Sequence, residues 1–97
     1  MIVSFKDQAT EDIFNGVNSK GARKSCSKAL WRVAARKLDQ LDSVISVEEL
    51  MVPPGNKLES LSGNRSGQFS IRINDQYRIC FMWDDSGPHN VEITDYH

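Results

Sequence analysis

The stretch from Gly67 to Ile79 constrains the fold more than any other part of the chain. Two runs in which apolar and polar residues alternate flank the short polar segment 74–76, and this pattern is typical of a β-hairpin. Among short loops, only a three-residue loop keeps the apolar residues of both strands on one side. That apolar set comprises Phe69, Ile71, Ile73, Tyr77, Ile79, Phe81 and Trp83. We therefore expect one face of the hairpin to be core and the other to be semi-polar.

The same register places Arg72 directly opposite Arg78. Like charges opposite each other destabilise a sheet, so the pair needs an acidic neighbour or a bound anion. The two arginines form either a phosphate-facing surface or a splayed, solvated pair, and the sequence pattern leaves both interpretations open.

Length and composition limit the classes of protein to which this chain can belong. The chain has 97 residues, of which 39% are apolar, and this is enough for one modest core and one domain. Its net charge is −1, from 12 basic and 13 acidic residues, so nucleic-acid binding has to rest on local clusters of cations. The N-terminal apolar run is too short for a signal peptide, and no apolar run approaches the roughly 18 residues of a membrane span. We expect a cytoplasmic protein.

The chemistry available to the chain is that of acids, bases and cations. Cys26 and Cys80 belong to no CxxC motif and have no histidines at metal spacing, so we expect two reduced structural thiols. A glycine-rich phosphate loop, an HExxH motif and a metal-spaced carboxylate cluster are all missing from the sequence, which predicts that neither a metal nor a cofactor is needed.

The first half of the chain is expected to be mainly helical. Residues 2–5 predict a first strand, Asp7 is a candidate cap for a short helix to Asn15, and Gly16 is a typical helix end. Residues 17–23 are polar with glycine breaks, which predicts a mobile surface loop. A main helix is predicted over about 25–42, because its apolar residues fall within an arc of roughly 140°. These are Leu30, Trp31, Ala34, Ala35, Leu38 and Leu41.

A basic stripe, Lys28, Arg32 and Arg36, recurs every fourth residue on the opposite side of this helix, and Lys24 extends it at the helix entry. Three interpretations are compatible with such a stripe: a solvated helix face, a phosphate-facing surface, or a dock for an acidic partner.

The second half of the chain is expected to be mainly a sheet. Ser46 and Glu49 fit a capping box, which predicts one helical turn over about 47–50. The segment 53–56 has to be a loop because of its prolines, residues 57–61 are extended, and 62–67 turn the chain into the hairpin. A turn over 84–89 leads to a last strand over 90–94. The order predicts an α+β layer with an antiparallel sheet of three or four strands, to which the first strand is added.

The chain ends on Asp95, Tyr96 and His97, three groups with acid, base or hydrogen-bonding chemistry directly after a strand that should adjoin the hairpin. A terminal histidine is either a frayed surface group or part of a site.

Four motifs in this order resemble one known family. They are LESLSG at 58–63, GQFSIRIN at 67–74, YRICF at 77–81 and the final DYH at 95–97. Together they resemble the HigB (GraT-like) toxins of the RelE/ParE superfamily of type II toxin–antitoxin systems, over nearly the whole chain and most strongly over 53–97. The resemblance implies one RelE/HigB-like toxin domain over 1–97, with two N-terminal helices packed on a small antiparallel β-sheet. It also implies a growth-inhibiting, metal-independent endoribonuclease that cuts mRNA in the ribosomal A site.

The resemblance implies roles for particular residues. Arg78 matches the strand arginine of the family, and Asp95, Tyr96 and His97 match its terminal acid, tyrosine and histidine. In the implied mechanism a base takes the proton of the ribose 2′-OH, a cation stabilises the transition state, and an acid protonates the departing 5′ oxygen. We assign Arg78 as the cation and His97 as the acid. Asp95 or Glu59 acts as the base or orients His97, and Tyr96 stacks on a base or donates a hydrogen bond. Assisting phosphate contacts are assigned to Arg72, Lys57 and Arg65, and further ones to the basic stripe.

The chain departs from the family pattern before the hairpin. Some HigB enzymes have a histidine and a lysine three residues apart there, and Glu59 and Ser62 stand at the matching positions. Glu59 is thus either a replacement base or a surface glutamate, and we expect reduced toxicity.

Two alternatives to a nuclease remain: a toxin that inhibits another target such as DNA gyrase, and an attenuated toxin that acts mainly by binding its antitoxin. The expected partners are a HigA-like helix-turn-helix antitoxin, mRNA and the ribosome, with DNA reached only through the antitoxin and no membrane. The antitoxin is expected on the basic stripe and the first helix.

Overall fold

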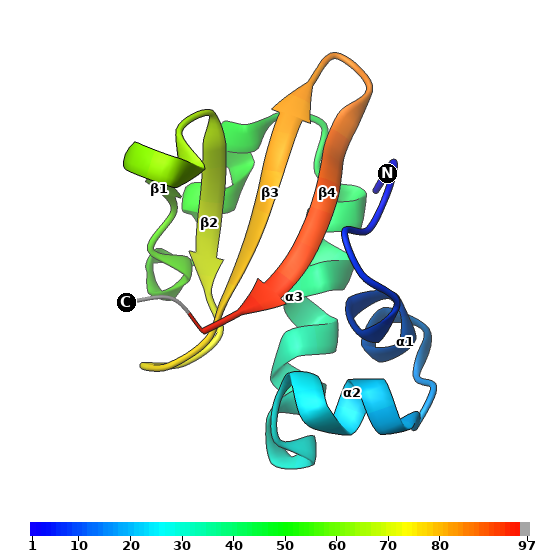
Figure 1. The fold of residues 1–97 in the computed structure, drawn as a ribbon. Helices are drawn as coiled ribbons and strands as arrows, with labels where there is room; N and C mark the ends of the chain where they lie inside the picture. The colour runs from blue at the N-terminus through cyan, green and yellow to red at the C-terminus, as the bar shows by residue number, and fades with distance from the viewer. Residues whose placement is uncertain (96–97) are drawn as a thin grey trace.

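Helices and a twisted antiparallel sheet form two layers in the computed structural model, which describes residues 1–95 (Figure 1). The α-helices are α1 (Gln8–Asn15), α2 (Lys20–Ser25) and α3 (Trp31–Ser43), and the 3-10 turns are η1 (Lys28–Leu30), η2 (Val47–Met51), η3 (Pro54–Asn56) and η4 (Gly63–Arg65). The strands are β1 (Glu59–Ser60), β2 (Gln68–Arg72), β3 (Arg78–Asp84) and β4 (Gly87–Thr94), in the spatial order β1-β2-β3-β4. The α+β class is confirmed, but the helical layer holds three α-helices within these residues where two were expected.

The central hairpin has the predicted register. Ile71 lies opposite Ile79 and Arg72 opposite Arg78, and the Ile73 amide donates to the Tyr77 carbonyl at 2.9 Å. The Asn74 side chain builds the turn, because its Oδ1 accepts from the amides of Gln76 and Tyr77. Local alternation and turn chemistry were therefore sufficient to predict this element.

One face of the sheet forms the core with α3, as expected. Apolar side chains of β2, β3 and β4 are buried against those of the helix, chiefly Ile71, Ile79, Phe81, Val91, Ala34, Leu38 and Leu41. The opposite face is more closed than the semi-polar surface that we expected, since Ser70 and Cys80 are also fully buried and Glu92 is 8% exposed. The long side chains of Lys6 and Arg65 reach Glu92 across this face, and their aliphatic stems add cover.

The first helix is confirmed, and the first strand is only partly so. Asp7 caps α1 by accepting from the Thr10 amide at 2.7 Å, and Gly16 ends it at φ 74°. The N-terminal segment runs parallel to β4, but its ladder is a single bridge between Phe5 and Val91. The first strand predicted over 2–5 is therefore confirmed only as this bridge and its flanking hydrogen bonds.

The expectation of a loop over 17–23 was also wrong, because α2 begins at Lys20. Ser19 caps this helix, accepting from the Ala22 amide at 3.1 Å, while its hydroxyl donates to Asp12 of α1 at 2.6 Å. Ala22 is completely buried. A contact between two helices thus outweighs the weak helix propensity of this segment.

The main helix is shorter than expected at its start. Cys26 has an extended backbone, with φ −157° and ψ 162°, and Ser27 caps the short turn η1, so regular α-helix begins only at Trp31. The capping box of Ser46 and Glu49 is confirmed. Other corrections are small: η3 makes a 3-10 turn of the proline loop, and β4 begins three residues earlier than predicted, at Gly87.

Within the described chain, no helix is long and apolar enough to cross a membrane.

Candidate functional site

A cleft of about 400 Å³ opens beside the turn between β2 and β3. We call it the basic cleft, and its lining residues are Lys57, Glu59, Arg72, Asn74, Asp75, Gln76 and Arg78. Four candidate residues from the sequence therefore meet here, although they come from the η3 exit and from three different strands. Three of them are cations and one is a carboxylate, so the cleft can hold a phosphate group and place a potential base beside it.

Arg78 is held in place by groups from two neighbouring segments. Its Nε donates to the Ser70 hydroxyl at 2.8 Å, and its Nη2 donates to the carbonyl oxygen of Lys57 at 2.6 Å. Ser70 is fully buried on the adjacent strand, so one end of this support is rigid. Among residues 1–95 these bonds engage Nε and Nη2, which leaves Nη1 for a ligand. The guanidinium is thus oriented before anything binds.

Arg72, which lies opposite Arg78, has one of the acidic neighbours that we expected for this arginine pair. Its guanidinium forms a hydrogen-bonded ion pair with Asp75 in the turn. The Asp75 side chain is 99% exposed, and an ion pair this exposed contributes little stability. A phosphate oxygen can therefore replace Asp75 as the partner of Arg72 at small energetic cost.

Lys57 supports the basic cleft through its backbone as well as its charge. It follows η3 in the left-handed region, with φ 46° and ψ 55°, which is unusual for a residue other than glycine. This conformation accompanies the hydrogen bond from Arg78 to the Lys57 carbonyl. Lys57 thus both orients Arg78 and adds a cation to the same cleft.

Of the two candidate carboxylates, Glu59 lines the cleft and Asp95 contacts one of its lining residues. Glu59 is exposed on β1, lines the cleft and pairs in register with Ser70. Asp95 follows β4 and accepts from Gln76 Nε2 at 3.0 Å, so it lies at the edge of the same turn. Thr94, just before it, pairs with Arg78 in register. Tyr96 and His97 lie outside the described residues.

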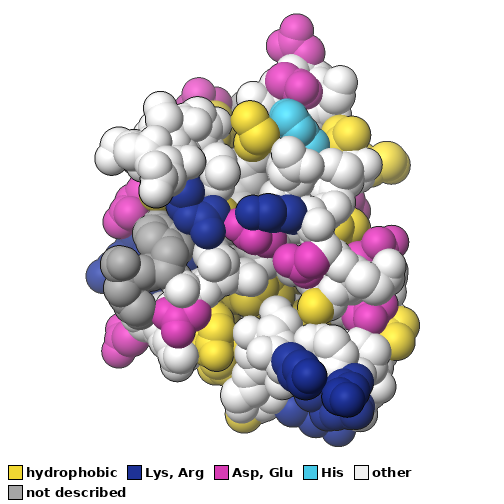
Figure 2. Space-filling view, in the orientation of Figure 1, with side chains coloured by type: hydrophobic (Ala, Val, Ile, Leu, Met, Phe, Trp, Pro, Cys, Tyr) yellow, Lys and Arg dark blue, Asp and Glu magenta, His cyan; other side chains and the backbone are white. Residues whose placement is uncertain are grey.

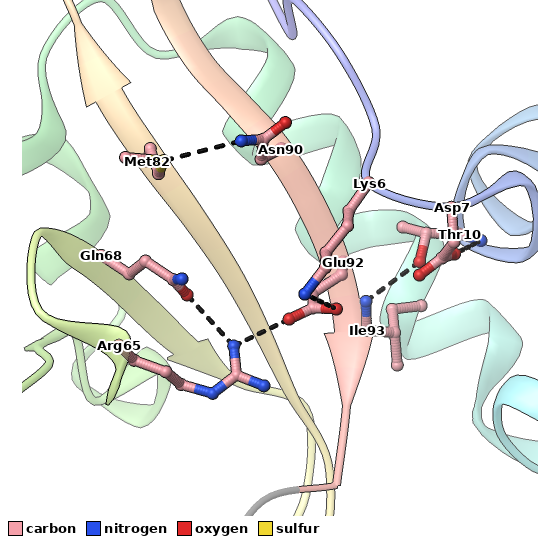
Figure 3. A network of polar contacts seen from close by, with 9 residues as sticks. All are labelled: Lys6, Asp7, Thr10, Arg65, Gln68, Met82, Asn90, Glu92 and Ile93. Atoms are coloured by element: carbon pink, nitrogen blue, oxygen red, sulfur yellow. Dashed lines mark hydrogen bonds and ion pairs between the residues drawn. The ribbon is translucent and has the colours of Figure 1, made fainter. Parts of the chain in front are cut away.

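Arg65 is placed elsewhere, on the outer face of the sheet (Figure 3). Its Nη1 donates to Glu92 Oε1 at 2.7 Å and to Gln68 Oε1 at 3.1 Å, while Lys6 Nζ lies 3.4 Å from Glu92 Oε2. The described contacts of Arg65 thus join η4 to β4, and the residue is not among those that line the basic cleft.

The basic stripe lies outside the lining of the basic cleft. Lys28, Arg32 and Arg36 are all exposed, as the solvated and ligand-facing interpretations both require. Burial, followed by repulsion from Arg36 and Arg72, lowers the pKa of Lys37. Positive charge therefore extends from Arg72 on β2 to Arg36 and Lys37 in the middle of α3.

Lys37 was missed by the sequence pattern because it lies beside the stripe and not on it. Its ammonium donates to Asn56 Oδ1, and the Asn56 amide in turn donates to Gln40 Oε1 at 3.0 Å and to the Leu50 carbonyl at 3.1 Å. Asn56 is fully buried. The only local sign of this contact was the asparagine at the end of the proline turn. The sequence does not indicate that Lys37 is its partner.

A second group of cations lies on α2, in the segment that was expected to be a loop. Lys20, Arg23 and Lys24 are exposed on α2, and Figure 2 shows lysine and arginine side chains gathered over this helix. The surface of α2 is therefore locally basic although the net charge of the chain is −1.

The two cysteines are buried, and the described residues form no metal site. Both cysteines are buried and unbridged, as predicted, and burial raises the pKa of Cys80 to about 11 and raises that of Cys26. Both are thus protonated at neutral pH and are poor nucleophiles. In the part of the chain that the structure describes, no group of three or more His, Cys, Asp or Glu side chains is arranged to hold a metal ion.

Comparison with known proteins bears out the resemblance noted from the motifs. The family model described as "RelE-like toxin of type II toxin-antitoxin system HigB" matches residues 3–97. Toxin HigB-1 of Vibrio cholerae serotype O1 is 40% identical over 96 residues, covering 96% of this chain and 95% of the relative. A protein of Haemophilus influenzae named only "Uncharacterized protein" is 36% identical over 64 residues, covering 66% of this chain and 63% of its own.

Among solved structures, the YoeB-YefM complex from Staphylococcus aureus contains a chain with the same fold. The TM-score is 0.60, with coverage of 100% of this chain and 95% of the other, at 23% sequence identity. The fold agrees with the assignment that the sequence relatives and the family model support. The chain therefore belongs to the HigB-like family of RelE-like toxins of type II toxin–antitoxin systems.

Proposed function

We propose that this toxin is an endoribonuclease that cleaves mRNA on the ribosome. The observation that carries the proposal is the basic cleft, in which Arg78, Arg72 and Lys57 surround a space of about 400 Å³ beside Glu59. A scissile phosphate in this cleft meets a guanidinium already oriented by Ser70 and Lys57. Preorganised cations stabilise developing negative charge better than groups that must rearrange during the reaction.

In the proposed reaction the ribose 2′-oxygen attacks the adjacent phosphorus and the bond from phosphorus to the 5′ oxygen breaks. The products are a 2′,3′-cyclic phosphate and a 5′-hydroxyl. Glu59 takes the proton of the 2′-OH, Arg78 neutralises the charge on the non-bridging oxygens, and His97 protonates the leaving oxygen. Asp95 orients His97, and Tyr96 stacks on or hydrogen-bonds to a base. Arg72, Arg36 and the neighbouring Lys37 hold flanking phosphates.

The proposal is tested by mapping RNA 5′ ends after induction in cells without an antitoxin. New ends carrying a hydroxyl and clustered within translated codons are expected for the wild type and for Arg23→Ala, an exposed arginine of α2 outside the basic cleft. Arg78→Ala should produce almost none. Arrest of growth without new RNA ends would instead support an inhibitor of another target such as DNA gyrase.

A second measurement addresses the ribosome and the metal. Purified toxin is expected to cut mRNA bound to translating ribosomes much faster than the same RNA alone, and to do so with its activity unchanged after brief chelation that leaves the ribosomes intact. Equal cutting of naked RNA would remove the ribosome from the proposal. Activity lost with EDTA and restored by a divalent ion would overturn the metal-independent mechanism.

We further propose that a HigA-like helix-turn-helix antitoxin in the cytoplasm neutralises this chain, and that DNA is reached only through it. The support is the family itself and the Staphylococcus aureus neighbour, whose title names a complex of YoeB with YefM. Co-expression with a small helix-turn-helix protein encoded beside the gene should restore growth and yield a stable complex on gel filtration. Failure of both would count against this partner.

A further inference from the structure

A second pocket lies at the opposite end of β3 from the basic cleft. Its volume is about 370 Å³. Because β3 runs from Arg78 to Asp84, its seven residues separate the two sites by roughly 20 Å. We call it the acid-rimmed pocket, and the residues that matter for the argument are Met1, Val44, Ile45, Trp83, Asp84 and Asp85.

Large apolar side chains stand in solvent around this pocket. Ile45 is 90% exposed and Met1 is 83% exposed, and both line it. Val3 does not line the pocket but is 54% exposed, and its Cγ2 lies 3.8 Å from the position of a Cβ built on the pocket-lining Gly87. Single exposed apolar residues are common on protein surfaces, whereas several around one concavity indicate an interaction site.

The backbone that carries these side chains is fastened at several points. The Ile45 amide donates to Glu49 Oε2 at 2.7 Å, and the Ile2 amide donates to Asp42 Oδ1 at 2.8 Å. The carbonyl of Met1 rests against Gly87, where an added Cβ would come within 2.8 Å of the oxygen. The apolar groups are thus presented on a fixed frame, which lowers the entropy cost of binding.

The charge at the rim selects the kind of partner. Asp84 and Asp85 flank the pocket, and Figure 2 shows acidic side chains at the tip of the β3–β4 hairpin, beside a histidine and hydrophobic groups. His89 Nε2 lies 3.3 Å from Asp84, and both aspartates are exposed. Such a rim repels RNA phosphates and anionic lipid, and it attracts lysine and arginine.

We propose that the acid-rimmed pocket docks a polypeptide segment in which a bulky apolar side chain stands next to lysine or arginine. The apolar side chain enters between Met1, Ile45 and Trp83, and the basic side chain pairs with Asp85. A segment bound there lies at the other end of the sheet from Arg78 and leaves the basic cleft open. The inference requires neither nuclease activity nor an antitoxin.

The test selects peptides from a random display library on the full wild-type protein, with Ile45→Ser protein used to remove binders of other surfaces. The peptides recovered should share an aliphatic or aromatic residue beside a lysine or arginine. A synthetic peptide of that sequence, titrated into isotope-labelled protein, should shift the NMR signals of Ile45, Trp83 and Gly87 and leave those of Gln76 and Arg78 in place.

Variants then separate the apolar and the charged contributions. Ile45→Ser should weaken the peptide roughly tenfold, as loss of a central apolar contact does. Asp85→Lys should weaken it several-fold at low salt and less at high salt. Val17→Ser, which alters a 48% exposed apolar residue away from the pocket, should change nothing. Melting curves confirm that each variant is folded.

Several outcomes would overturn the inference. These are a selection without common peptides, an acidic consensus, peptides that bind Ile45→Ser as well as wild type, and signal shifts confined to the basic cleft. Self-association that Ile45→Ser abolishes would mean that a second copy of the chain covers the pocket instead.

Discussion

At the scale of single residues, Arg78 joins strand geometry to the proposed chemistry. The strand sets its direction, and hydrogen bonds to Ser70 and to the carbonyl of Lys57 set its orientation. Arg72 across the hairpin is already paired with Asp75, so repulsion between the two arginines is a minor term. Removing Arg78 therefore loses more stability through the broken hydrogen bonds than it gains from reduced repulsion between the arginines.

Arg78→Ala should lower the cleavage rate by about 10²- to 10⁴-fold, the range for loss of one catalytic group. Loss of its bonds to Ser70 and Lys57 should reduce the free energy of unfolding by about 1 kcal/mol. Arg78→Lys should recover only part of the activity, because an ammonium lacks the paired geometry of the guanidinium. Single-turnover assays and thermal melts measure these effects. Full toxicity of a folded Arg78→Ala protein would refute the role assigned to this residue.

Lys57 allows backbone and charge to be tested separately. Glycine adopts φ 46° without the penalty that a Cβ brings, so Lys57→Gly should be more stable than Lys57→Ala by about 1 kcal/mol. Both variants lose the cation and should cleave RNA at similarly reduced rates. Chemical denaturation and cleavage assays of the pair provide the comparison, and equal stability of the two variants would mean that the left-handed backbone carries no strain.

At the scale of elements, the join between α1 and α2 carries a titratable group. Hydrogen bonds from Ser19 and then from Gln8 lower the pKa of Asp12 from its ordinary value of 3.8. A carboxyl whose pKa is lower in the folded state stabilises the fold above its unfolded pKa, and this stabilisation is lost as the pH falls through the folded value. The attachment of α2 should thus weaken below about pH 4.

Asp12→Asn should remove this part of the acid sensitivity. The wild type should lose more of its melting temperature between pH 5 and pH 3 than the variant, because only the wild type gives up the ionised acceptor of Ser19. Hydrogen exchange at the Ala22 amide reports on α2 directly. Asp39→Asn, an exposed position on α3, is the control, and identical acid profiles for Asp12→Asn and wild type would contradict the prediction.

At the scale of the whole molecule, charge is segregated although its sum is −1. Cations line the cleft at the β2–β3 turn and continue to Arg36 and Lys37 on α3, whereas Asp84 and Asp85 rim the pocket at the β3–β4 turn. The net charge alone therefore conceals two surfaces of opposite sign. The distribution is consistent with an RNA-facing side and a separate side for a polypeptide.

Arg36→Ala should weaken binding of a single-stranded RNA oligonucleotide and reduce the slope of log affinity against log salt by roughly 0.7, the value for one phosphate contact. Fluorescence anisotropy at several salt concentrations measures this slope. Lys6→Ala is the matched control, because the ammonium of Lys6 is paired with Glu92 on the outer face. An unchanged slope for Arg36→Ala would place this end of the stripe outside the RNA path.

The parts of the fold that depend on neighbours in the chain could be predicted from local sequence. Alternation and a three-residue turn specified the register of Arg72 against Arg78, and Asp7 with Gly16 specified both ends of α1. The capping box at Ser46 followed in the same way. Each of these depends on contacts a few residues apart, so propensity and spacing are sufficient to predict them.

The features that join distant segments of the chain could not be predicted in this way. Helix α2 forms because Asp12 of α1 anchors its cap and Ala22 is buried against the rest of the molecule. Arg65 donates to Glu92, 27 positions away, and Arg78 donates to the carbonyl of Lys57, 21 positions away. Such pairings depend on how the sheet and helices pack, and no local pattern encodes the packing.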